Sequence, residues 1–127
     1  MGRVQLARLD EMEKKRKAIV DKYNKLLGLK NFGSHLYPIL VENRNNFVGY
    51  MKENGISCSF HFLPLHKSPA FSKHNRIKLP VTEYVGSRVV TLPLFTGLSL
   101  QDVNYVCSKV KQFGKFTEGE FGLPVLF

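Results

Sequence analysis

The first thirty residues carry apolar side chains at helical spacing. Five of them are separated by three, seven, four and three positions, which places them on one face of a helix: Leu9, Met12, Ile19, Tyr23 and Leu26. Gly28 follows in the position where helices commonly end. The pattern predicts one helix over about 4–27, which would measure roughly 36 Å at about 1.5 Å per residue.

The rest of the chain alternates between strand and helix patterns. The expected elements are a strand at 35–41, a helix at about 43–54, a strand at 56–62, a short helix at 80–86, a strand at 88–92 and a last helix capped by Ser99. Pro38 lies inside the first strand and indicates an edge or a bulge, because proline cannot donate to a strand ladder. Residues 114–127 show no clear periodicity, so this tail stays unassigned.

This order of elements predicts an α/β (α+β) fold. We expect a small three-stranded sheet with helices mainly on one face, preceded by the long N-terminal helix. The expected domain covers residues 1–113, of which 1–28 form that helix. One face of such a sheet needs cover from elsewhere, so we expect a partner or a further domain to pack against this chain.

Composition is that of one small domain. The chain has 127 residues and is 43% hydrophobic, which is enough for one core and too little for two. No run of about 18 apolar residues occurs, and charges fall within the first ten residues, so we expect neither a membrane span nor a secretory signal. Cys58 and Cys107 do not form a disulfide-framework spacing. A cytoplasmic location is expected.

The formal net charge of +9 raises the question of nucleic acid. It is concentrated in two blocks: residues 1–30 hold nine basic and four acidic side chains, and residues 63–90 hold five basic and one acidic. The first block is the predicted helix, whose basic run at 14–17 reads as a solvated or partner-facing surface. No zinc-finger spacing or recognition-helix pattern is present, so nucleic acid is a disfavoured partner.

Residues 55–69 contain the side chains that are the best candidates for a functional site. This run delivers His61 and His66 into a loop that Pro64 and Pro69 restrict. A zinc site or a nucleophilic pair of Cys58 with His61 is disfavoured, because residues three apart on a strand point to opposite faces. We therefore expect no metal ligands in this chain and no catalytic cysteine–histidine pair.

Four segments, in order, resemble the C-terminal small domain of the DegT/DnrJ/EryC1/StrS family of pyridoxal-phosphate-dependent sugar aminotransferases. Gln5 to Asp10 with Arg16 and Tyr23 resembles the interdomain helix, and Ser34 to Tyr37 the first small-domain strand. The specific match is residues 61–69, His-Phe-Leu-Pro-Leu-His-x-x-Pro, which is similar to the family's His-Tyr-x-Pro-Leu-His-x-x-Pro loop. Residues 79–83 and 92–103 match the segment that ends the domain.

The resemblance implies a fold and a chemistry. It implies the C-terminal domain of the aspartate-aminotransferase fold type I, and transfer of an amino group, usually from glutamate, to a keto sugar linked to a nucleotide. In the family the cofactor lysine and the phosphate pocket lie in the large domain, and no lysine here lies in a segment like the cofactor-lysine motif. We therefore expect this chain to hold no pyridoxal phosphate by itself and to be inactive alone. A large-domain partner or a homodimer is expected.

The resemblance also implies substrate-binding residues. In the family, the positions matching His35, His61, Phe62 and His66 lie near the cleft between the domains. Imidazoles can hydrogen-bond sugar hydroxyls or a diphosphate. Phe62 stands where the family usually has tyrosine, so a contact through that hydroxyl would be lost here.

Two functions from different classes stay open. The first is a fragment of a sugar aminotransferase, which needs the large domain for activity. The second is a stand-alone binding module whose basic helix and loop recognise an anionic ligand, a nucleotide sugar or a nucleic acid.

Overall fold

The N-terminal helix is broken near its start. In the computed structural model, which describes residues 2–74 and 77–127, helix α1 spans Gly2–Ala7 and α2 spans Leu9–Leu27. Arg8 joins them, and its N–H donates to Gln5 O at 3.1 Å. No residue of α1 is buried, whereas α2 buries Ile19, Val20, Tyr23 and Leu27. The single helix predicted over about 4–27 is therefore two helices, and only the second contributes buried side chains to the core.

The sheet has four strands, not the three predicted. They are β1 (Tyr37–Val41), β2 (Val89–Leu92), β3 (Phe116–Glu118) and β4 (Pro124–Leu126), in the order β2-β1-β4-β3. β1 is antiparallel to β2 and parallel to β4, and β4 is antiparallel to β3. Both extra strands come from the tail at 114–127. The α/β class is confirmed, and the tail is an integral part of the sheet.

The predicted strand at 56–62 is reduced to a single bridge. Ser59 and Thr91 exchange two backbone hydrogen bonds, of 3.2 and 2.6 Å, along the free edge of β2. Beyond them the chain enters a loop with two 3₁₀ turns, η1 (Leu65–Lys67) and η2 (Pro69–His74). Pro64 stands just before η1 and has no N–H to continue a ladder.

Pro38 lies in a central strand, yet at a position with one strand neighbour. β1 pairs with β2 along residues 37–40, whereas β4 pairs only with Leu40 and Val41. The missing N–H of Pro38 therefore removes no bond to β4. A proline is therefore tolerated at this position of a central strand.

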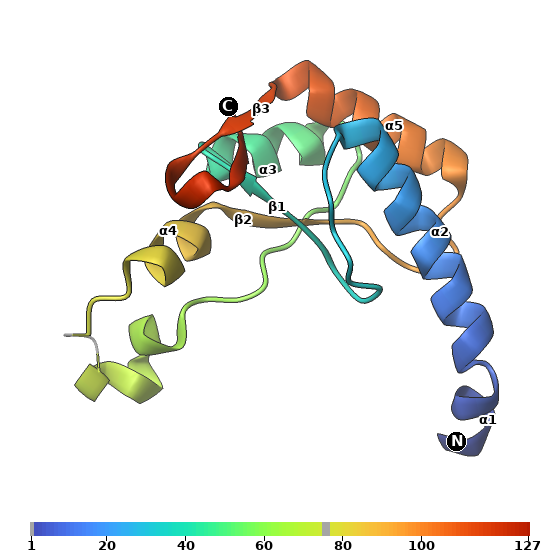
Figure 1. Cartoon of the computed structure of the whole chain (residues 1–127), viewed down its shortest axis with the longest axis horizontal. Coiled ribbons are helices and arrows are strands. Elements are labelled where there is room, and N and C mark those ends of the chain that lie inside the picture. Colours follow the sequence, from blue (N-terminus) through green and yellow to red (C-terminus); the bar gives the residue numbers. More distant parts are fainter. Residues whose placement is uncertain (1, 75–76) are drawn as a thin grey trace.

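Three helices cover one face of the sheet. Figure 1 shows α3 (Arg44–Glu53) and α5 (Leu100–Phe113) above β1 and β2, with α2 descending beside α5. The core between them includes fully or nearly fully buried side chains from every layer: Tyr23, Tyr37, Ile39, Phe47, Met51, Val90, Val103, Val110 and Leu126. The prediction of helices mainly on one face is confirmed.

The opposite face is only partly covered. Helix α4 (Pro80–Arg88) lies on that side with the 3₁₀ turns, below the strands in Figure 1. An open apolar hollow of about 350 Å³ remains there, lined in part by Pro38, Leu40, Val85, Val89 and Leu123. This face therefore leaves part of its apolar surface open.

Candidate functional site

Two of the predicted site residues meet at a small hollow at the end of the sheet. His35 and His61 line a space of about 180 Å³ together with Ser57, Ser59, Thr91 and residues 92–94. His61 Nδ1 lies 3.0 Å from Thr91 Oγ1. Because this hydrogen bond uses Nδ1, the other imidazole nitrogen, Nε2, is the one left to meet a ligand.

The sheet brings these residues together from three separate parts of the chain. His35 stands two residues before β1, Thr91 lies within β2, and the Ser59–Thr91 bridge holds the 57–61 segment against β2. Thr91 is nearly buried, with 6% of its surface exposed, so its hydroxyl is a fixed partner for His61. The hollow thus presents imidazole and hydroxyl groups, which suit hydrogen bonds to a polyhydroxylated ligand.

Phe62 and His66 do not line this hollow. Phe62 is 74% exposed and sets its ring edge-on to the His61 ring, with centroids 4.9 Å apart. His66 is buried, and its Nε2 lies 3.1 Å from Glu83 Oε1 on α4. The structure therefore separates the two histidines of the motif into different surroundings.

Sequence reasoning missed the polar residues beside His61. Ser57, Ser59 and Thr91 line the hollow, but the sequence marks them only as members of strand-like runs. One signal was available. Thr91 is the single polar residue in the β2 run Val-Val-Thr-Leu, and a hydroxyl in a buried strand usually has a partner.

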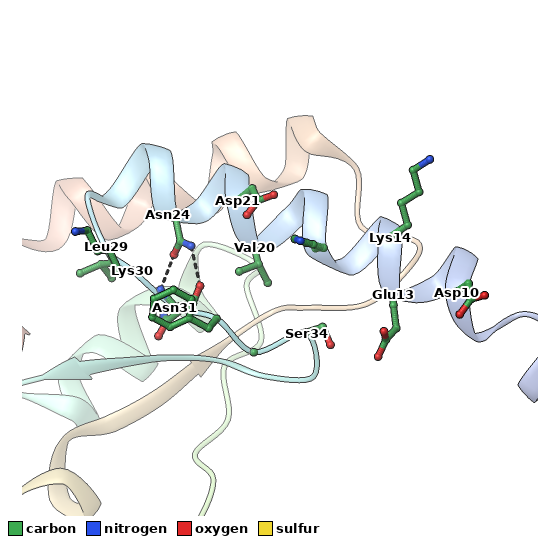
Figure 2. A pocket seen from close by; sticks show the side chains of 13 residues that line it. Asp10, Glu13, Lys14, Val20, Asp21, Asn24, Leu29, Lys30, Asn31 and Ser34 are labelled. Carbon is green, nitrogen blue, oxygen red and sulfur yellow. Dashed lines mark hydrogen bonds between the residues drawn. The ribbon is translucent and has the colours of Figure 1, made fainter.

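A larger hollow lies along α2 and carries mixed charge. It measures about 700 Å³ and runs between α2 and the loop at 29–34. Figure 2 shows Asn24 and Asn31 joined by two hydrogen bonds at one end of it, of 2.8 and 3.0 Å. Its charged lining consists of three acidic and three basic side chains, namely Asp10, Glu13, Asp21, Lys14, Lys17 and Lys30. This balance does not favour an anionic ligand, although the hollow is larger than that at His61.

The residues present do not fit a covalently bound pyridoxal phosphate. That cofactor needs a lysine whose amine is desolvated enough to lose its proton. All thirteen lysines fall within the described residues, and none of them is buried. Within residues 2–74 and 77–127, no three histidine, cysteine, aspartate or glutamate side chains gather as a metal site, and no helix there is long and apolar enough to cross a membrane.

Cys107 is buried and Cys58 is partly buried. Desolvation raises the pKa of Cys58 and of Cys107 to about 11 each. A thiol with such a pKa is almost wholly protonated at neutral pH, and the protonated form is a poor nucleophile. Neither thiol therefore has the properties of a catalytic nucleophile.

Comparison with known proteins gives a consistent result. The model of the DegT/DnrJ/EryC1/StrS aminotransferase family matches residues 1–111. An uncharacterized protein of Methanocaldococcus jannaschii is 31% identical over 133 aligned residues, which cover 88% of this chain and 34% of that protein. A dTDP-3-amino-3,6-dideoxy-alpha-D-galactopyranose transaminase of Aneurinibacillus thermoaerophilus is 32% identical over 81 residues, which cover 63% of this chain and 22% of the enzyme.

Solved structures agree on the fold. DesV of S. venezuelae, solved in complex with a ketimine intermediate, superposes with a TM-score of 0.78 at 26% identity, over 87% of this chain and 34% of DesV. The chain thus spans about a third or less of the length of the relatives it matches.

Proposed function

Because this chain belongs to the DegT/DnrJ/EryC1/StrS aminotransferase family, we propose that it forms the substrate-facing side of a sugar aminotransferase site and holds no cofactor of its own. The complete enzyme would move an amino group, with glutamate as the expected donor, to a keto sugar linked to a nucleotide. Pyridoxal phosphate would supply that chemistry from a large domain outside this chain. By itself the chain would be inactive.

The convergence of His35 and His61 on one hollow is the observation that supports this proposal most. The residues lie 26 positions apart in the sequence, and the resemblance implies that both match family positions near the cleft between the domains. His61 is oriented by Thr91, so Nε2 can bond a sugar hydroxyl or a phosphate oxygen with little loss of side-chain entropy. Phe62 lies outside the hollow and would contribute its exposed ring beside His61. His66 would contribute indirectly, because it is buried against Glu83 and not at the hollow.

Calorimetric titration tests the binding role. A dTDP-hexose is added to the full chain and to His61→Ala, with dTDP alone and the free hexose as separate arms. We expect binding of the dTDP-hexose to weaken about tenfold in His61→Ala, because a ligand hydrogen bond is lost. Lys52→Ala, which changes an exposed residue of α3, should bind as the parent does. Equal affinity in His61→Ala and the parent would count against the proposal.

Cofactor retention tests the proposal that this chain holds no pyridoxal phosphate of its own. After incubation with pyridoxal phosphate and desalting, the chain should show no visible absorbance from bound cofactor. Borohydride reduction should leave no single stoichiometrically labelled lysine, because none of the thirteen lysines is buried. One stoichiometric adduct on one lysine would show that a cofactor site exists here.

The alternative of a stand-alone module for anions rests on the net charge of +9. It predicts that a DNA or RNA oligonucleotide binds more tightly than the dTDP-hexose, and that this affinity falls steeply with salt because counterions are released. The aminotransferase proposal predicts the reverse order. We also propose a cytoplasmic location, which the two free cysteines support.

A further inference from the structure

The loop that carries His61 is fastened to helix α4 through a carboxylate. Glu83, in the first turn of α4, accepts from His66 through Oε1 at 3.1 Å, and its Oε2 lies 3.2 Å from Lys67 Nζ. The backbone N–H of Leu79 also donates to Oε1, at 3.4 Å. We call this group of His66, Lys67 and Glu83 the carboxylate clasp. It joins two segments of the chain through His66 and Glu83, which lie 17 positions apart in the sequence.

A second contact docks the same loop on the same helix face. Pro64 packs so closely on Gly86 that a Cβ atom at Gly86 would collide with the proline ring. Gly86 follows Glu83 by three residues, which places both on one face of α4. Arg44 strengthens the junction, since its Nη1 donates to Gly86 O at 2.8 Å while its guanidinium lies 5.0 Å from the Phe60 ring centroid.

Helix α4 is itself held in place, so Glu83 has a fixed position. The Tyr84 ring contacts the Arg88 guanidinium at 3.9 Å and the Phe121 ring at 5.5 Å, centroid to centroid for the rings. The Tyr84 hydroxyl accepts from the N–H of Glu120 at 3.1 Å. The C-terminal turn η3 (Glu120–Gly122) therefore anchors α4, although it lies beyond the residues that the family model matches.

The chemistry of the clasp favours an ionised carboxylate. The pKa of Glu83 is lowered by its hydrogen bonds with Lys67, with His66 and with the Leu79 N–H. His66 is 6% exposed, which leaves it little room to approach a ligand in the hollow at His61. The geometry of His66 therefore fits a residue that stabilises the loop and does not contact the ligand.

We propose that Glu83 is a positioning residue, which fastens loop 61–67 to α4 through His66 and Lys67 and so keeps His61 against Thr91. The two histidines of the motif then have different roles. His61 faces the ligand, and His66 holds the loop. The consequence for ligand binding rests on the proposed function, whereas the fastening of the loop does not.

Hydrogen exchange on the full chain, without ligand, tests the fastening. The Lys67 and Ser68 amides donate within η1 to Pro64 O and Leu65 O, both at 2.9 Å, and report on the loop. We expect both amides to exchange about tenfold faster in Glu83→Ala than in the parent. A smaller rise is expected in Glu83→Gln, which keeps an acceptor for His66. Glu53→Ala, on α3, is the matched control and should leave them unchanged.

An amide of α5 distinguishes opening of the loop from unfolding of the whole domain. Val106 is buried in α5, so its amide exchange reports global unfolding rather than loop opening. Faster exchange at Lys67 and Ser68 with unchanged exchange at Val106 supports the proposal. Unchanged exchange at all three amides in Glu83→Ala overturns it. If all three accelerate equally, the loop has no separate fastening, and the proposal also fails.

Ligand titration with conservative rescue separates positioning from direct contact. His66→Gln keeps an N–H that can donate to Glu83, whereas His66→Ala does not. We expect His66→Gln to bind a dTDP-hexose within about threefold of the parent, and His66→Ala and Glu83→Ala to weaken binding as His61→Ala does. If His66→Gln loses affinity while its loop amides stay protected, His66 touches the ligand and the positioning role is wrong. If the parent binds no dTDP-hexose although Glu83→Ala loosens the loop, the proposed function fails and the clasp stands.

Discussion

Thr91 Oγ1 lies 3.0 Å from His61 Nδ1, and this bond fixes the imidazole at the hollow that His35 also lines. Thr91→Val keeps the shape of the buried side chain and removes the hydroxyl. We expect the affinity for a dTDP-hexose to fall severalfold, because His61 must then be ordered on binding. The free energy of unfolding should change by less than about 1.5 kcal/mol, since one hydrogen bond to a partly exposed partner is lost. Calorimetric titration and urea unfolding measure the two effects.

The control for Thr91→Val is Thr117→Val, which changes an exposed residue of β3 in the same way. It should leave the affinity unchanged. Equal affinities in Thr91→Val and the parent would mean that the bond to Thr91 does not orient His61 for a ligand.

Core truncation tests the place of the C-terminal tail. Leu126 is fully buried and pairs with Val41 in the middle of the sheet. Leu126→Ala should lower the free energy of unfolding by about 2–5 kcal/mol, because it leaves a cavity in the core. Phe127→Ala, which changes a half-exposed neighbour, should cost clearly less. Equal midpoints in urea for Leu126→Ala and the parent would contradict the assignment of β4 to the core.

The start of α5 makes stability depend on acid pH. The Ser99 hydroxyl accepts from the Asp102 N–H at 3.0 Å, and the Asp102 carboxylate accepts from the Ser99 hydroxyl and backbone N–H. These bonds lower the pKa of Asp102, the hydroxyl bond most. The carboxylate's contribution is therefore present above the ordinary pKa of 3.8 and is lost as pH falls through the lower folded pKa.

Ser99→Ala should lower the free energy of unfolding by about 1 kcal/mol at neutral pH, through loss of the cap. It should also reduce the loss of stability below pH 4, because the carboxylate loses its strongest partner. Ser108→Ala, within α5, is the control and should keep the acid dependence of the parent. Urea unfolding between pH 3 and 7 measures both effects. Parallel pH curves for Ser99→Ala and the parent would contradict this account.

Thiol reactivity tests the burial of the two cysteines. With pKa values of about 11, each thiol is ionised to only about one part in a thousand at pH 8. A disulfide reagent should therefore react far more slowly with the folded chain than with the urea-unfolded chain. The rate should rise about tenfold per pH unit up to about pH 10. Equal rates in the folded and unfolded chains would show that the thiols are not desolvated.

The same shift affects stability at alkaline pH. Burial raises the folded pKa of Cys58 and Cys107 above the ordinary value of 9.0. The advantage of keeping these thiols neutral is fully present below the unfolded pKa and is lost as pH rises from about 9 toward 11. Cys107→Ala would also leave a cavity in the core, and the cost of that cavity would obscure the effect of titration. The measurement is therefore the pH dependence of the free energy of unfolding of the parent chain.

Local signals in the sequence predicted the helices well. Ser99 and Asp102 are three residues apart and form the predicted cap of α5, and Gly28 adopts a φ of +70° at the end of α2. The Asn54-Gly55 pair ends α3, with Gly55 at a φ of +74°. Each of these features depends on hydrogen bonds and backbone angles within about four residues, and such information is present in any short window of the sequence.

The sheet was predicted less well, for a physical reason. β3 and β4 have three residues each, which is too short for an alternation of apolar and polar positions to show. β4 is held by pairing with β1, some 85 residues earlier, at Leu40–Val125 and Val41–Leu126, and β3 is held by pairing with β4. The 56–62 run has strand-like composition but keeps only the Ser59–Thr91 bridge.

The sequence by itself determined the family, the class of fold and the candidate residues, because motifs and periodicity are properties of the chain read in order. The tertiary structure decided what those residues can do. His61 and His66 are five positions apart in one motif, yet His61 faces the hollow beside Thr91 while His66 is buried against Glu83. That division depends on where β2 and α4 lie in space. Long-range packing sets their positions, and no local pattern of side chains encodes it.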